Sequence, residues 1–67
     1  MISIVLNDEV VTVSIGTSLV KVLEHQAIEL DAVALALNAE VVPKSRWPHI
    51  VCQQDDKLDV FSVVAGG

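Results

Sequence analysis

The chain has 67 residues, of which 52% are hydrophobic, and a formal net charge of −5 at neutral pH. A chain this short forms one small domain, with no room for a nucleotide-binding fold or for two lobes around a cleft. The hydrophobic fraction argues against disorder. The negative charge argues against a nucleic-acid partner, because nothing here would displace counterions from phosphate. We therefore expect a single domain over residues 1–67.

The number of cysteines and the length of the apolar segments indicate in which cellular compartment the protein lies. Cys52 is the one cysteine of the sequence, so no internal disulfide forms and a reducing compartment is expected. The first residues, Met1 to Ile4, carry neither the basic segment nor the cleavage site of a signal peptide. The longest unbroken apolar run, Val33 to Leu37, is far shorter than the ~20 residues that a membrane-spanning helix needs. These features predict a cytoplasmic protein with no membrane partner.

The first 16 residues predict a β-hairpin. Ile2, Ile4 and Leu6 alternate with the residues between them, as in a strand with one face in the core. Val11, Val13 and Ile15 repeat the pattern and predict a second strand, which Gly16 ends; Asn7-Asp8 has the composition of the turn between the two strands.

A helix is predicted next. Thr17 or Ser18 can cap it by accepting a hydrogen bond from a free backbone amide. Apolar residues then follow at helical spacing, with charged residues off that stripe. The stripe consists of Leu19, Val22, Leu23 and Ala27. Residues 28–31 are interpreted as a loop.

The second half of the chain predicts three strands and one helical turn. Residues 33–37 form the third strand, and a tight turn at Ala39-Glu40 leads to a short fourth strand at Val41-Val42. Pro43 ends the pairing because it has no amide hydrogen. The remaining elements are a helical turn over residues 44–48, in which Trp47 packs, a polar turn over residues 53–57, and a last strand over residues 58–64.

This order of elements predicts a two-layer α+β domain, with a mixed sheet of four to five strands and one main helix on one face. The right-handed crossover rule places the third strand beside the first hairpin. A long helix across a mixed sheet is the ubiquitin-like, or β-grasp, arrangement, in which the first and last strands are neighbours.

The last strand predicts an exposed apolar patch. Asp59 is not expected in the core without a partner, so Leu58 and Val60 point inward and Phe61 and Val63 point outward. Ser3 sets the first strand in the same way and turns Val5 outward. Val5, Phe61 and Val63 are therefore a candidate docking patch for a partner. The alternatives are a loop that covers Phe61 and a bulge that shifts the phase.

The sequence ends in Ala65-Gly66-Gly67, which we interpret as a mobile tail. Without side chains at its last two positions this backbone can enter a narrow channel, and its three residues reach ~10 Å when extended. A terminal carboxylate is an anion and a poor electrophile at neutral pH, so it reacts only after activation, for example as an acyl-adenylate. The chain has no phosphate-binding glycine loop, so another protein must supply ATP. The alternative is a frayed terminus without function.

The segment from Val41 to Trp47, Val-Val-Pro-Lys-Ser-Arg-Trp, resembles the V-P-(K/R)-x-x-W segment of the thiamine-biosynthesis sulfur carrier (ThiS) family. Residues 34–38, the acidic turn before the last strand and the terminal Ala65-Gly66-Gly67 are also similar to that family. The likeness covers essentially the whole chain and is strongest over residues 33–67. One departure is Asp55, where family members often have the glycine of Asp-Gly-Asp, and it leaves the geometry of that turn open.

The resemblance implies a carrier and co-substrate of other enzymes, which itself binds no cofactor or metal and catalyses nothing. Gly67 would be adenylated by an E1-like enzyme of the ThiF type, which uses ATP and magnesium. Sulfur that comes ultimately from a cysteine desulfurase would then replace the adenylate. The thiocarboxylate on Gly67 would donate its sulfur to thiazole synthase, of the ThiG type, with Ala65 and Gly66 entering the partner's active site.

Other functions remain open from the residues alone. The small subunit of molybdopterin synthase shares the fold and the tail, and a ubiquitin-like modifier would join Gly67 to a lysine. A plain interaction module would bind without its tail. The acidic charge either steers the chain to a basic groove of an activating enzyme or only favours solubility.

Several reactive side chains are interpreted as structural or as ordinary surface groups. Cys52 is expected to pack as a small apolar residue and Trp47 to pack in the core. The two histidines lack metal-ligand spacing, and the acidic residues near residue 56 have the pattern of a solvated turn. The residues set aside on these grounds are His25, His49, Asp55, Asp56, Asp59, Lys21, Lys44 and Lys57.

Overall fold

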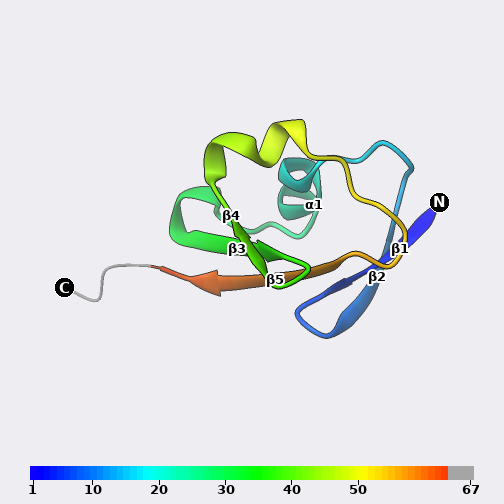
Figure 1. Ribbon diagram of the computed structural model, residues 1–67, viewed down its shortest axis with the longest axis horizontal. Helices are drawn as coiled ribbons and strands as arrows, with labels where there is room; N and C mark the ends of the chain where they lie inside the picture. Colours follow the sequence, from blue (N-terminus) through cyan, green and yellow to red (C-terminus); the bar gives the residue numbers. More distant parts are fainter. Residues whose placement is uncertain (64–67) are drawn as a thin grey trace.

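Alternating apolar side chains build a mixed sheet in the computed structural model, which describes residues 1–63 (Figure 1). Its five strands lie in the order β2-β1-β5-β3-β4. They are β1 (Ile2–Leu6), β2 (Glu9–Val13), β3 (Val33–Leu37), β4 (Glu40–Val42) and β5 (Lys57–Ser62). The helical segments are α1 (Leu19–His25) and two 3₁₀ helices, η1 (Leu30–Ala32) and η2 (Lys44–His49). The predicted fold class, an α+β β-grasp with one main helix on one face, is confirmed for the described residues.

The last strand occupies the centre of the sheet. β5 runs parallel to β1 and antiparallel to β3, so the first and last strands are neighbours as predicted. The prediction that β3 lies beside the first hairpin is wrong, because β5 separates them. The crossover rule fixes the hand of the connection between parallel strands, but it does not say which later strand fills the space between them.

The second strand is shorter than predicted. It ends at Val13, and Ile15 is exposed in a turn instead of continuing the alternation. Gly16 has φ +92°, which glycine adopts readily, and Thr17 closes the turn by donating from its backbone nitrogen and its hydroxyl to the Ser14 carbonyl (3.2 and 2.7 Å). The turn therefore removes Ile15 from the sheet.

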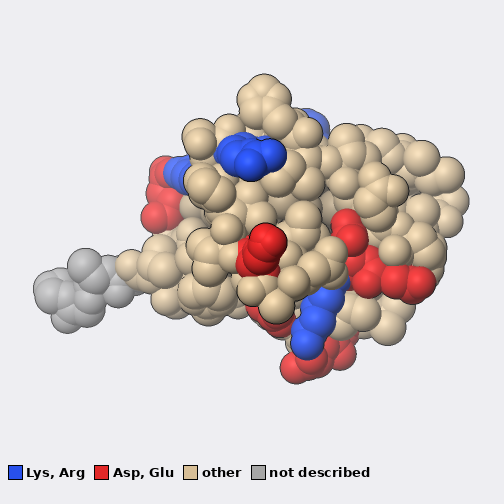
Figure 2. Space-filling model, in the orientation of Figure 1, with Lys and Arg blue, Asp and Glu red and all other residues tan. Residues whose placement is uncertain are grey.

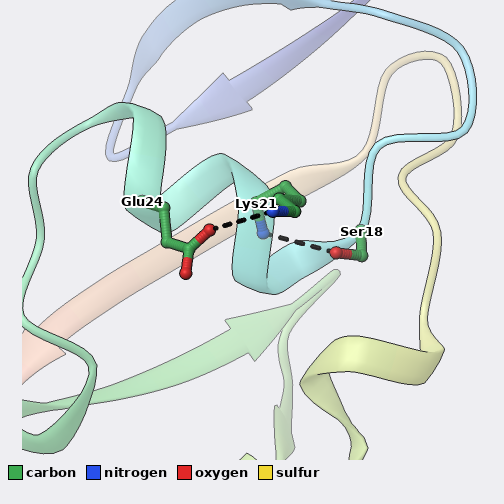
Figure 3. A network of polar contacts seen from close by, with 3 residues as sticks. All are labelled: Ser18, Lys21 and Glu24. Carbon is green, nitrogen blue, oxygen red and sulfur yellow. Dashed lines mark hydrogen bonds and ion pairs between the residues drawn. The ribbon is translucent and has the colours of Figure 1, made fainter.

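Helix α1 begins at the cap that the sequence offered (Figure 3). Ser18 Oγ accepts a hydrogen bond from the Lys21 backbone nitrogen at 3.3 Å, and Lys21 Nζ lies 3.5 Å from Glu24 Oε1. The cap satisfies one of the free amides of the first turn. The exposed ion pair adds only a few tenths of a kcal/mol.

The end of α1 differs from the prediction that Ala27 belongs to its buried stripe. Ala27 is exposed, with φ +58°, and its amide donates to the Glu24 carbonyl while Ile28 donates to Leu23 (both 3.0 Å). This is the Schellman arrangement, in which a left-handed residue, usually glycine, ends the helix. Because alanine stands at that position, no local residue type indicates where the helix ends.

The core lies between the inner face of the sheet, α1 and η2. Trp47 is 1% exposed, and its Nε1 donates to the Val42 carbonyl at 2.9 Å. Backbone bonds from Leu19 to Ile50 (3.0 Å) and from Cys52 to Thr17 (2.8 Å) join the segment after η2 to the start of α1. The buried apolar residues that form this cluster are Ile4, Leu6, Val13, Leu19, Val22, Leu23, Leu35, Trp47, Cys52 and Leu58. The predicted core packing of Trp47 and Cys52 is therefore confirmed.

Besides the β1–β2 turn at Asn7-Asp8, two further turns use left-handed backbone without glycine. The turn between β3 and β4 is at Asn38-Ala39, with φ of +51° and +73°, one residue earlier than predicted. Asp55, the position at which the sequence left the turn geometry open, has φ +68° and keeps the turn before β5. Aspartate tolerates this region better than most residues, and Gln54 Nε2 donates to its carboxylate at 2.9 Å.

Candidate functional site

The outer face of β5 exposes two large apolar side chains. Phe61 is 46% exposed and Val63 is 53% exposed, whereas Leu58 is fully buried and Val60 packs against the core. The predicted phase of the last strand is therefore confirmed. The alternatives, a covering loop or a bulge, do not occur among the described residues, because the β3–β5 register runs without interruption from Leu58 to Ser62.

Strand β4 adds a third apolar side chain to this face. Val41 pairs with Ala36, which in turn pairs with Asp59; the next β3–β5 pair on the same face of the sheet is Ala34 with Phe61. Directly opposed residues share a face of the sheet, so Val41, at 69% exposure, lies on the same side as Phe61. We call Val41, Phe61 and Val63 the outer-face patch.

Val5 does not join this patch. In the parallel register Val5 lies opposite Lys57, four residues before Phe61, a separation of about 13 Å along the strand. It is half-buried, and its partner on the other side is Val10. Val41 was not among the predicted patch residues. Its face follows from the folded chain, in which Val42 packs on the core and its neighbour Val41 therefore points outward.

Polar side chains fix the start of β5. Asn38 Oδ1 accepts a hydrogen bond from the Lys57 amide (2.9 Å), and Asn38 Nδ2 donates to Asp56 Oδ1 (3.1 Å). Asp56 Oδ2 accepts from the Gln53 amide at 2.8 Å. These bonds tie the β3–β4 turn to the turn before β5 and so position the strand that leads to the C-terminal segment.

The charge near the sheet is mostly negative, with Lys57 on β5 as the cation among its strand residues. Most of the carboxylates on the face drawn in Figure 2 lie in its lower half, on the side of the sheet. Asp8 and Glu9 are exposed at the β1–β2 turn, and Asp59 is half-buried between Lys57 and Phe61 on β5. On the opposite side of the fold, exposed Lys44 pairs with Asp31. A partner of the sheet surface therefore meets carboxylates around the apolar patch.

The remaining candidate residues do not assemble into a reactive site within residues 1–63. Cys52 is buried, and burial, followed by the negative charge of Asp56, raises the pKa of its thiol, so the nucleophilic thiolate is disfavoured. His25 on α1 and His49 on η2 are exposed on separate elements. In this part of the chain no three His, Cys, Asp or Glu side chains gather as metal ligands. None of its helices has the length and apolarity to cross a membrane.

Val64 and the predicted tail, Ala65-Gly66-Gly67, lie outside the described residues. Their predicted roles stay predictions. The structure does describe the strand that leads to them: β5 ends at Ser62, and Val63 still donates from its amide to the Ala32 carbonyl at 3.0 Å. The outer-face patch therefore includes residues of the strand that directly precedes the C-terminal segment in the sequence.

The fold and this surface define a small β-grasp domain that has an exposed apolar patch beside its C-terminal strand. Two solved structures share the fold: the crystal and solution NMR structures of the thiamine biosynthesis protein (ThiS) of Geobacter metallireducens. The crystal structure aligns with a TM-score of 0.85 over 98% of this chain and 100% of that one. The NMR structure aligns with a TM-score of 0.77 over 98% and 88%. Sequence identity to both is 17%, so they establish the fold.

Sequence comparison identifies the family. The family model described as "ThiS family" matches residues 3–67. The sulfur carrier protein ThiS of Escherichia coli (strain K12) is 31% identical over 64 residues, which cover 96% of this chain and 97% of that protein. The chain therefore belongs to the ThiS family, the sulfur carriers of thiamine biosynthesis.

Proposed function

We propose that the chain carries sulfur for the thiazole ring of thiamine as a thiocarboxylate on Gly67, and that it is a co-substrate of its partner enzymes. The observation that carries this proposal is the match of residues 3–67 to the ThiS family, because the matched region includes Ala65-Gly66-Gly67. The outer-face patch beside the C-terminal strand supports it, since a partner that engages the last residues must also hold the domain.

The chemistry requires activation from outside. The carboxylate of Gly67 attacks the α-phosphate of ATP, which an E1-like enzyme of the ThiF type binds with magnesium, and pyrophosphate leaves. A persulfide, whose outer sulfur comes from cysteine through a desulfurase, then displaces AMP from the acyl-adenylate and forms an acyl disulfide. A thiol reductant cleaves the S–S bond of that acyl disulfide, which releases the thiocarboxylate and leaves the reductant oxidised. The thiocarboxylate is a better nucleophile than the carboxylate, and it passes sulfur to a thiazole synthase of the ThiG type. ATP and a reducing environment for the thiol chemistry make the cytoplasm the proposed location.

The outer-face patch is the proposed docking surface for the activating enzyme. Phe61 is a large apolar group held on a rigid strand, so burying it against a partner orders little that is flexible. The carboxylates around the patch favour a basic surface on the enzyme, and association should slow as salt rises.

The test is intact-mass measurement after incubation with the activating enzyme, ATP and a sulfur source. We expect a gain that matches exchange of one oxygen for sulfur, located at the C-terminus by fragmentation. A variant without Gly67 should keep the circular dichroism spectrum and lose the gain. A gain that survives this deletion contradicts the proposal. Capture by a molybdopterin synthase large subunit, in place of thiazole synthase, would contradict the thiazole assignment alone.

A further inference from the structure

The backbone of β5 offers hydrogen-bonding groups on both sides. On the β3 side, Lys57 accepts from the Asn38 amide at 2.8 Å, and the Val63 amide donates to Ala32 at 3.0 Å. Residues of an antiparallel ladder bond to the partner strand alternately, so Asp59 also turns its peptide groups toward β3. The residues between them, from Leu58 to Ser62 in steps of two, turn theirs to the other side, toward β1.

Strand β1 covers only the beginning of that other side. Its amides donate from Val5 to the Asp56 carbonyl (2.8 Å) and from Asn7 to the Leu58 carbonyl (2.9 Å). The chain then turns away at Asn7-Asp8, where φ is +48° and +68°. The side chain of Asn7 makes the last contact, with its Oδ1 accepting from the Val60 amide at 2.8 Å.

Three backbone groups beyond Asn7 have no hydrogen-bond partner in residues 1–63: the carbonyl of Val60 and both the amide and the carbonyl of Ser62. Figure 1 shows β5 extending past the β1–β2 turn. Natural edge strands usually carry a proline, a lysine or a bulge that discourages pairing. This segment, Val60-Phe61-Ser62, has none of these among its residues.

We propose that an extended segment of the activating enzyme pairs with this open edge of β5, as an added strand, and so directs the residues after Val63 toward the adenylation site. The inference rests on the proposed function and adds how the partner holds the chain. Strand addition uses main-chain hydrogen bonds for affinity and neighbouring pockets for specificity. Here Phe61 and Val63 lie on the outer face beside the edge and supply the apolar contacts.

The charge around the edge favours an enzyme segment over a second copy of the chain. Asp8 and Glu9 are exposed beside Asn7, and Asp59 precedes Val60 on β5. Two copies paired along this edge would bring like charges together, and a pair of such short strands is not stable without further contacts. An enzyme segment that carries lysine or arginine at the end near Asp8 avoids the repulsion between like charges. The rest of the enzyme supplies the further contacts that a short strand pair needs.

Hydrogen exchange by NMR tests the pairing directly. In the free protein the Ser62 amide should exchange fast, whereas the Phe61 amide, which faces β3, should be protected. On saturation with the activating enzyme, Ser62 exchange should slow at least tenfold, while Phe61 serves as the internal reference. Unchanged Ser62 exchange in the saturated complex overturns the inference. Protection that instead rises with the concentration of the free chain assigns the edge to a second copy and also overturns it.

A pair of variants tests the energetic role. Ser62→Pro removes the outward amide without removing a bond to β3, so it should weaken enzyme binding about tenfold and leave the thermal midpoint nearly unchanged. Ser62→Ala keeps the amide and should bind within twofold of the parent. Equal binding by the folded proline variant contradicts the inference; if that variant does not fold, the exchange measurement decides.

Thiocarboxylate formation in the same samples separates this inference from the proposed function. A chain that gains sulfur while its Ser62 amide stays unprotected overturns the strand addition alone. A chain that the activating enzyme neither binds nor modifies overturns both.

Discussion

The inner and outer faces of the sheet both carry large apolar side chains, but they expose them to very different degrees. Leu35 and Leu58 on the inner face are fully buried beneath α1 and η2, whereas Phe61 and Val41 on the outer face are 46% and 69% exposed. Burial in the core therefore explains the apolar residues of the inner face, but it does not explain the apolar residues of the outer face. An exposed apolar patch that does not stabilise the fold points to a partner, and here it borders the strand that leads to the C-terminus.

The largest expected effect contrasts one residue from each face. Trp47→Ala removes the largest core side chain and its hydrogen bond to Val42, and should lower the free energy of unfolding by about 3–5 kcal/mol. Phe61→Ala should lower it by less than about 1 kcal/mol, because Phe61 buries much less surface. Urea unfolding measures both. Similar losses for the two variants would mean that the faces do not differ as described.

For binding to the activating enzyme, we expect the outer face to matter more than the core. Phe61→Ser removes the centre of the outer-face patch, and we expect it to raise the Kd for the activating enzyme about tenfold or more. Val10→Ser is the matched control, because Val10 is also an exposed apolar residue of the sheet but lies on β2, away from the patch. Calorimetry should give a control Kd within twofold of the parent. Equal effects of the two substitutions would exclude the patch as the docking surface.

Substitutions in the turns that join the layers should have smaller effects on stability than those in the core. Ala27 and Ala39 have φ of +58° and +73°, where a side chain is strained. Replacing either by glycine should stabilise the fold by about 0.5–1 kcal/mol, since the relief of strain exceeds the added entropy of the unfolded chain. Ala34→Gly, in regular strand β3, should instead destabilise by a similar amount. Thermal unfolding measures the sign, and destabilisation by all three would contradict the turn geometry.

The smallest effect concerns pH and the buried thiol. Burial and, to a lesser extent, Asp56 raise the pKa of Cys52, so the folded protein keeps this proton at a higher pH than the unfolded chain does. The resulting stability is fully present below about pH 8.5, the unfolded pKa, and is lost as pH rises through the folded pKa. The urea midpoint of the parent should therefore fall more steeply above that pH than the midpoint of Cys52→Ala. Parallel declines would contradict this role of the thiol.

Local patterns predicted most of the inner face and the phase of β5. Asp59 fixed which β5 residues point inward, and the size of Trp47 predicted its burial, because these depend on single residues and their neighbours. The position of Val5 was not predictable in this way. The parallel register of β1 and β5 depends on contacts between residues about 50 positions apart, including the bond from Val60 to the Asn7 side chain.

The prediction of where elements end was wrong at positions where a residue other than glycine adopts a left-handed backbone conformation. Ala27 ends α1 with a conformation that usually requires glycine, so the spacing of the apolar residues predicted a stripe that extends past the observed end of the helix. Val41 was missed because a three-residue strand gives too little alternation to assign its face by itself. Tertiary packing of Val42 settles that face, and it becomes visible only in the folded chain.

The most direct test of the central claim is reconstituted thiazole formation with thiazole synthase, the activating enzyme, ATP and a sulfur source. The full chain should support product formation, and a chain without Gly66 and Gly67 should support none while it keeps its fold and still competes for the activating enzyme through the outer-face patch. Product formed at the parent rate by the shortened chain would contradict the account.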